Sequence, residues 1–284
     1  MMKIFLSFIS SYFLFSSCYT PRYMYSPATQ NIPLLEKKGD ASLSAFYSTS
    51  FASKSKDATK NLQVKNYGSD ILAAYAISNH WALQAGYFAR RETNDGNYLS
   101  ITDSAVIHYQ RKTWEASAGY FKNLPGRAHS YFQLFAGIGA GYFNFNDVGK
   151  DANGIIYQQY HYAKALKFYL QPAVFLNAPN HFTTAISSRF TLIKFKKIKT
   201  NYSFTQLNNF KLDSIALSPT LFWEPALTNY IGFKKITGLK IALQAGFAFL
   251  VSKKFVDTRP FNFSAGINLD LPKILTRKKR ADKN

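Results

Sequence analysis

The sequence predicts an all-β protein, an up-and-down antiparallel transmembrane β-barrel of about ten strands. Apolar residues recur at every second position along most of the chain, which is the side-chain period of a strand and not the 3.6-residue period of a helix. Most of these alternating runs reach the roughly 9–11 residues that a tilted strand needs to cross a bilayer. The connections between the runs alternate between long polar segments and short turns, as they do in transmembrane barrels.

Composition narrows the class of protein further. Of the 284 residues, 47% are hydrophobic and 17% are aromatic, which is too apolar for a disordered chain. The uncharged apolar run at residues 4–15 is shorter than the roughly 20 residues that a membrane-spanning helix requires. A single cysteine excludes a disulfide framework. The formal net charge of +20 points to contact with anionic groups.

The chain begins with features of an exported protein. Lys3, an apolar stretch and the small residues 16–18 follow the order of a secretory signal, so residues 1–17 are predicted to lie outside the fold. Leu14-Phe15-Ser16-Ser17-Cys18 resembles a bacterial lipobox, and this resemblance implies a lipid on Cys18. The alternative is ordinary secretion, with Cys18 lost or left as a free thiol. The aperiodic, proline-containing residues 18–38 are predicted to be a lipid-anchored or free periplasmic tether.

The barrel is predicted to occupy residues 39–271, followed by a basic periplasmic tail at 272–284. Its clearest alternation runs from Phe261 to Leu271. Long polar connections are expected at 52–66, 92–109, 146–159, 196–211 and 252–260, and short turns at 78–79, 123–128 and 177–180, with 225–235 as a longer exception. The ten expected strands are 41–51, 67–77, 80–91, 110–122, 129–145, 160–176, 181–195, 212–224, 236–250 and 261–271.

The two faces of the predicted strands differ in composition. One face carries Leu, Ile, Phe and Tyr, and the other carries mostly Gly, Ser, Ala, Thr, Asn and Gln. A soluble sandwich also has period-two strands, but its wet face tends to carry long charged side chains. Small polar residues suit a narrow interior, so the apolar face is predicted to contact lipid.

Taken together, the lipobox-like start, the segment from Tyr19-Thr20-Pro21 to Lys38-Gly39-Asp40 and the ten alternating runs resemble small outer-membrane β-barrel (lipo)proteins of the Bacteroidota type. The resemblance covers nearly the whole chain. It implies location in the cell outer membrane and insertion by the barrel-assembly machinery. Such barrels usually end on an aromatic residue, whereas this one closes at Leu271 and continues to residue 284.

A ten-stranded barrel leaves at most a thin lumen, because eight strands are already filled by side chains. Charged residues fall on the face assigned inward, and buried charges must be paired. Glu115 and Glu224 are therefore expected to pair with Lys167 and Arg189. These pairs are interpreted as a structural plug, with a path for an ion or small ligand as the alternative.

Basic residues gather in the predicted outer loops and rim. In the assumed topology they lie at the level of lipopolysaccharide phosphates, which makes outer-membrane lipid the expected partner; a specific protein partner is not indicated. Nucleic acid is not expected, because the chain is exported and its aromatic residues lie in strands. The predicted basic rim consists of Lys54, Lys56, Lys194, Lys196, Lys197 and Lys199.

Evidence for catalysis is weak. His161, Asp151 and Asp213 fall near the outer rim, where a hydrolase acting on lipid or peptides would place its catalytic groups, but none of the five histidines belongs to a recognisable motif. No spacing suggests a metal site, and no cofactor is predicted. The sequence therefore predicts a structural or interaction protein and not an enzyme. A rim hydrolase and a narrow channel or ligand-binding barrel remain the alternatives.

Overall fold

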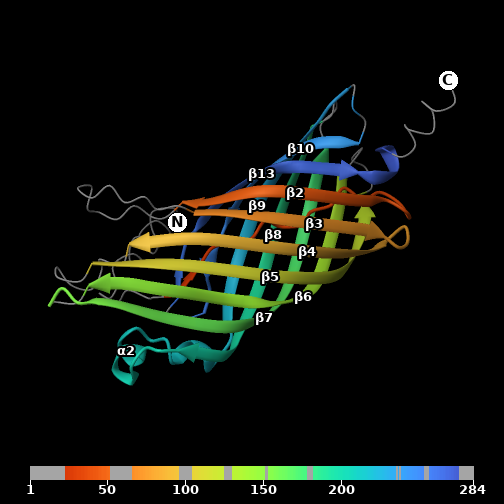
Figure 1. The fold of residues 1–284 in the computed structure, drawn as a ribbon. Coiled ribbons are helices and arrows are strands. Elements are labelled where there is room, and N and C mark those ends of the chain that lie inside the picture. Colours follow the sequence, from red (N-terminus) through yellow and green to blue (C-terminus); the bar gives the residue numbers. More distant parts are fainter. Residues whose placement is uncertain are drawn as a thin grey trace, which may run out of the picture.

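The alternating runs form long antiparallel strands that close into a barrel (Figure 1). The computed structural model describes residues 23–51, 66–95, 104–124, 130–150, 153–177, 182–234, 236, 238–252 and 256–274. Every strand of the barrel is hydrogen-bonded to its two neighbours, and the ring closes where the last strand pairs with the first. β10 and β11 are two parts of one crossing, so the described residues form ten crossings.

The barrel strands follow one another in chain order. They are β2 (Ala41–Phe51), β3 (Asn66–Ala76), β4 (Trp81–Asp95), β5 (Ser104–Asn123), β6 (Ser130–Lys150), β7 (Ile156–Asn177), β8 (Phe182–Thr200), β9 (Thr220–Gly232), β10 (Leu239–Phe247) with β11 (Phe249–Leu250), and β13 (Phe261–Asp270). Two short strands, β1 (Tyr23–Tyr25) and β12 (Val256–Thr258), pair in parallel as a separate two-stranded sheet. Within the described ranges, no helix has the length and apolar character that a membrane crossing requires.

The predicted ten-stranded barrel is confirmed, but the eighth strand, β9, was placed wrongly. It was expected at 212–224 and lies at Thr220–Gly232, so the turn that follows it is short like the others at that end. Pro225 explains the error, because proline lacks the N–H of a ladder and is unusual inside a strand. The barrel accommodates it where the pairing with the neighbouring strand is interrupted, between β10 and β11. Residues 204–209 (α2) and 214–216 (η1) occupy the connection before it.

The outside of the barrel carries an apolar band. On β7 the outward-facing side chains from Leu166 to Leu176 are uncharged, and Phe168 and Leu170 are about half exposed. Ten steps of about 3.4 Å along a strand tilted by about 40° give a band roughly 26 Å high, which matches the apolar girdle of outer-membrane barrels. Apolar side chains this exposed on neighbouring strands indicate contact with lipid.

A charge in the middle of this band is expected to destabilise the protein. Leu170→Arg places a cation at the midplane, where lipid-facing arginine costs about 2–4 kcal/mol. Unfolding by urea in phospholipid vesicles measures the cost. Leu217→Arg is the matched control, because Leu217 is 81% exposed in the connection between β8 and β9. If Leu170→Arg is as harmless as its control, the band does not face lipid.

The two ends of the barrel differ. Short turns, such as the one between β3 and β4, gather at the end where β2 begins and β13 ends (Figure 1). The long connections, including residues 201–219, lie at the other end. In outer-membrane barrels the short turns are periplasmic and the long loops are extracellular. We refer to these as the turn end and the loop end.

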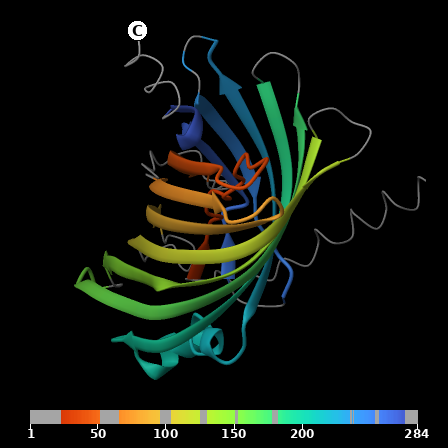
Figure 2. The ribbon, with the colours of Figure 1, turned by 90° about the vertical axis from the view of Figure 1, so that its right-hand side faces the viewer.

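The segment before β2 does not lie beside the barrel but inside it (Figure 2). Its side chains between Tyr23 and Leu35 are almost all buried, and they contact the inward faces of the strands. The described part of the predicted tether from residue 23 to residue 35 thus fills the lumen and is not a free linker beside the barrel. The physical reason is that its polar groups find partners on the inner wall, which the composition of the segment alone does not reveal. The predicted signal at 1–17 and most of the predicted tail at 272–284 lie outside the described residues.

Candidate functional site

The candidate functional site is the filled lumen, in which residues 23–35, here called the lumen segment, are held by the wall. Thr29 contacts three strands through its backbone N–H and its hydroxyl, and Gln30 contacts three others. Hydrogen bonds from the lumen segment reach a residue on each of the ten crossings. These wall residues are Ser48, Asp70, Glu92, Arg111, Gln133, Gln171, Ser187, Glu224, Gln244 and Ser264.

Gln30 shows why the segment is fixed in one register. Its backbone N–H donates to Gln244 Oε1 at 2.7 Å, and its carbonyl accepts from Gln244 Nε2 at 3.1 Å. Its side-chain amide donates to the carbonyl of Glu224 at 2.6 Å and accepts from the Ser187 hydroxyl at 2.7 Å. Because buried polar groups are costly when unpaired, shifting the segment by one residue would leave several of these groups without partners.

Three of the four charged residues predicted for the lumen lie together. Lys167 Nζ is 2.6 Å from Glu115 Oε1, and Arg189 Nη1 is 3.4 Å from the other carboxylate oxygen. Arg189 Nε also donates to Gln171 Oε1 at 2.7 Å, and its guanidinium lies 4.5 Å from the centre of the Tyr169 ring. All three charged side chains are buried, so a single carboxylate contacts two cations away from bulk water.

Glu224, the fourth predicted residue, is satisfied by hydroxyl groups. Its two carboxylate oxygens accept from the Tyr25 hydroxyl at 2.6 Å and from Thr191 Oγ1 at 2.5 Å. One of these donors belongs to the lumen segment and the other to the wall. Glu224 therefore ties the segment to β9, in addition to lining the barrel.

A second set of buried charges was missed in the sequence. Arg90 binds Asp70 through two nitrogens, and Arg111 Nη2 lies 2.7 Å from Glu92 Oε2. Ser26 of the lumen segment donates to Glu92 at 2.6 Å, and its carbonyl accepts from Arg111 at 2.8 Å. A signal was available, because Arg90 and Glu92 continue the alternation of inward residues on their strand. The two sets together hold four cations and four carboxylates, so their charges balance.

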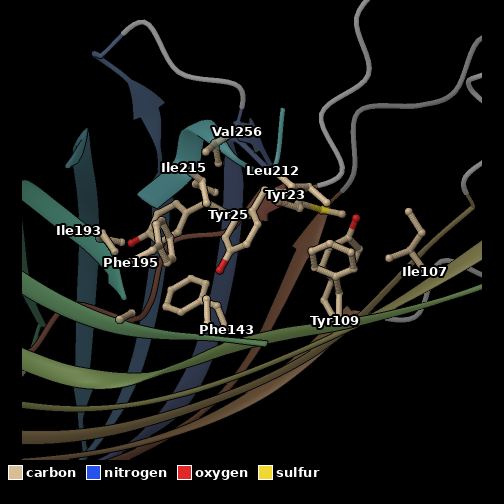
Figure 3. Close-up of a cluster of buried hydrophobic side chains, with 14 of the residues drawn as sticks. Tyr23, Tyr25, Ile107, Tyr109, Phe143, Ile193, Phe195, Leu212, Ile215 and Val256 are labelled. Carbon is tan, nitrogen blue, oxygen red and sulfur yellow. The ribbon is translucent and has the colours of Figure 1, made fainter. Parts of the chain in front are cut away.

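Aromatic side chains close the loop end of the lumen (Figure 3). Tyr23 lies 4.8 Å from Phe195 between ring centres, and Tyr25 stacks on Phe222 at 4.1 Å. Leu212 and Ile215 reach this cluster from the connection between β8 and β9, above the two tyrosines in the view of Figure 3. The lumen segment thus ends in an apolar cap that includes residues of a long loop.

A small cavity lies beside the lumen segment. A cavity of about 30 Å³ lies between Tyr25, Ser26 and the wall residues Arg90, Arg111 and Lys167. That is room for one or two water molecules. A hollow of about 380 Å³ lies among residues near the loop end of β4 and β5, including Arg91, His108 and Gln110.

Of the residues considered for the alternative of a rim hydrolase, His161 and Asp213 differ in exposure. His161 is fully buried, stacked on Phe145 at 5.1 Å between ring centres and in edge contact with Tyr23. Asp213 is exposed in the connection between β8 and β9, and Asp151 lies outside the described residues. A histidine without exposed surface cannot reach a substrate. Over the same described ranges, no group of three or more His, Cys, Asp or Glu residues is placed to hold a metal ion.

The described part of the predicted basic rim lies at the loop end of β8. Lys194, Lys196 and Lys199 are exposed, and Lys197 takes a left-handed backbone conformation with φ of 51° next to a shift in the pairing of β7 and β8. Lys54 and Lys56, like Cys18, fall outside the described residues.

No family model matches the chain, and no curated protein matches it in sequence. The chain is similar in fold to three solved barrels. The translocator domain of autotransporter NalP from Neisseria meningitidis is 11% identical, with a TM-score of 0.46, over 82% of this chain and 88% of that one. Outer membrane protease OmpT from Escherichia coli is 8% identical, with a TM-score of 0.42, over 81% and 93%. An outer membrane channel from Pseudomonas putida F1 is 9% identical, with a TM-score of 0.35, over 84% and 99%. At these identities the likeness concerns the fold alone.

Proposed function

We propose that the protein is an outer-membrane barrel with a structural or interaction role, whose lumen is held closed to solutes by its own residues 23–35. The observation that carries this proposal is the hydrogen bonding of the lumen segment to all ten crossings. A path for ions would have to run through the polar middle of the barrel, where the lumen segment is buried and the cavity beside Tyr25 and Ser26 measures about 30 Å³. The burial of His161 disfavours a rim hydrolase.

Planar lipid bilayers test the closed lumen. The purified protein is expected to give no stepwise current, while a general porin reconstituted in parallel gives discrete steps. Heat-modifiable migration on gels, which reports a folded barrel, shows that silence is not the result of unfolding. Regular conductance steps from the folded protein would contradict the proposal and favour a narrow channel.

We further propose that the outer leaflet is the partner of a basic strip on the outside of the barrel, defined as Lys112, Lys164, Lys194, Lys196 and Lys199. Cross-strand pairing places Lys112, Tyr142, Lys164 and Lys196 in one row across β5 to β8, and Lys194 and Lys199 flank this row. Along the described residues of these four strands, the carboxylates Glu115 and Asp147 point inward and are buried.

The position of the strip supports lipid phosphates as its ligand. Its row of Lys112, Lys164 and Lys196 lies just beyond the apolar band, toward the loop end, where Leu166 of β7 is followed outward by Lys164, and Lys194 lies level with Leu166 at the edge of the band. The phosphates of lipopolysaccharide occupy this level in the outer leaflet, and ammonium groups bind phosphate through charge-assisted hydrogen bonds. Lys112 also lies 6.0 Å from the centre of the Tyr142 ring, so the strip combines cations with an aromatic residue of the interface.

Removing charge from the strip is expected to weaken lipid binding by at least tenfold. The variant Lys164→Gln, Lys196→Gln and Lys199→Gln is titrated with lipid A in detergent micelles and compared with the wild type. The control replaces three exposed lysines near the turn end, Lys37, Lys122 and Lys234, and so changes the net charge equally. Equal affinity of both variants, or equal binding of dephosphorylated lipid A by the wild type, would argue against a phosphate site.

We also propose that the barrel-assembly machinery inserts the protein and that Cys18 carries a lipid. The lipobox-like sequence before Cys18 supports the lipid. We expect a fatty-acid analogue to label the wild type and not the Cys18→Ala variant.

A further inference from the structure

The lumen segment has a direction, which its contacts define. Leu35 packs with Phe121 and Phe135 near the turn end, and Ile32 packs with Leu72 and Phe175 further along the lumen. Tyr23 packs with aromatic residues at the loop end. The segment therefore passes through the whole barrel, with Tyr23 at the loop end and Leu35 at the turn end.

Each end of the segment is held by residues at its own end of the barrel. At the loop end, Tyr23, Met24 and Tyr25 pair in parallel with β12, which lies in the connection between β11 and β13. At the turn end, Asp40 accepts hydrogen bonds from the backbone of Glu36 and Lys37, and Gly39 takes a φ of 86°. This turn reverses the chain, so that it leaves the lumen and enters β2.

The stretch from Cys18 to Tyr23 is too short for Cys18 to lie at the turn end. Cys18 lies five residues before Tyr23, and five residues of extended chain span at most about 18 Å. Crossing back would require the thickness of the hydrocarbon core, about 30 Å, along a path that the segment itself already fills. The aromatic cap also holds Tyr23 at the loop end, because residues of the long connections pack around it there.

We infer that the chain crosses the outer membrane once through its own barrel, so that the residues around Cys18 are displayed on the outer face of the cell. The inference rests on the proposed location of the barrel in the outer membrane. Under this inference the N-terminal region is displayed on the cell surface and is not a periplasmic tether. A lipid on Cys18 then enters the outer leaflet and not the inner one.

Thiol labelling of intact cells with a membrane-impermeant maleimide tests the direction. Thr20→Cys reports the chain before Tyr23, Leu217→Cys reports the loop end, and Lys38→Cys reports the turn end, where Lys38 is exposed. The wild type gives the background from Cys18. We expect Thr20→Cys and Leu217→Cys to react in intact cells, and Lys38→Cys to react only after the outer membrane is permeabilised.

The outcomes separate the inference from the proposed function. If Thr20→Cys reacts together with Lys38→Cys and not with Leu217→Cys, the inferred direction is wrong. If Leu217→Cys is protected in intact cells and Lys38→Cys reacts, the assigned sidedness of the barrel fails, and the threading is still judged by which control Thr20→Cys follows. If Thr20→Cys reacts under neither condition, a peptide epitope inserted between Thr20 and Pro21 is used in its place. Antibody binding to this epitope on intact cells supports the inference. Antibody binding only after permeabilisation overturns the inference.

Discussion

Deleting residues 23–35 is expected to turn a silent barrel into an open channel. The deletion removes the side chains and backbone that fill the lumen and leaves a wall lined by polar and charged groups, including Glu115, Arg189 and Gln244. Water and ions can solvate these groups once the segment is gone, because a ten-stranded barrel is wider than one that its wall side chains can fill. Planar bilayers are expected to show discrete conductance steps for the variant and none for the wild type.

A milder variant guards against loss of folding in the deletion. Tyr25→Ala with Gln30→Ala removes the hydrogen bond to Glu224 and the side-chain bonds of Gln30, while the chain stays continuous. It is expected to show brief, intermittent openings. Lys37→Ala is the control within the same stretch of chain, because Lys37 is exposed beyond the turn end. A deletion variant that keeps heat-modifiable migration and remains silent would show that the segment does not hold the lumen closed.

Glu115→Gln is expected to cost about 3–5 kcal/mol of unfolding free energy, because it leaves buried cations without their shared counter-charge. Lys167 and Arg189 both contact this carboxylate. Urea unfolding of the refolded barrel in micelles measures the effect. Adding Lys167→Met to Glu115→Gln is expected to recover part of the loss, since one of the two stranded charges is then removed.

An exposed ion pair of the same chain provides the control. Lys273 Nζ lies 2.7 Å from Asp270 Oδ2 at the turn end, and the side chain of Lys273 is 52% exposed. Partial burial by itself lowers the pKa of Lys273, but the hydrogen bond and charge of Asp270 outweigh it and raise this pKa. Asp270→Asn is expected to cost less than about 1 kcal/mol, as exposed pairs do. Equal costs for Asp270→Asn and Glu115→Gln would mean that the lumen pair is not isolated from water.

The inward and outward faces of the strands could be predicted because alternation is a local property. Glu115 and Arg189 were assigned inward from their position in an alternating run, and both are buried. The same alternation did not predict which groups the buried charged side chains contact. Glu224 lies opposite Arg189 in the register of β8 and β9, yet its carboxylate accepts from Tyr25, which is 199 residues away in the chain.

The sequence by itself determined the period-two strands, their number and the side that meets lipid, since each of these follows from the order of apolar and polar residues over about ten positions. Only the tertiary structure decided that residues 23–35 lie inside the barrel and in which direction they run. Their composition is that of a linker, and their burial depends on hydrogen bonds to residues as far apart in the chain as Ser48 and Ser264. Such partners come together only when the ring of strands has closed, so no local sequence pattern could predict these hydrogen bonds.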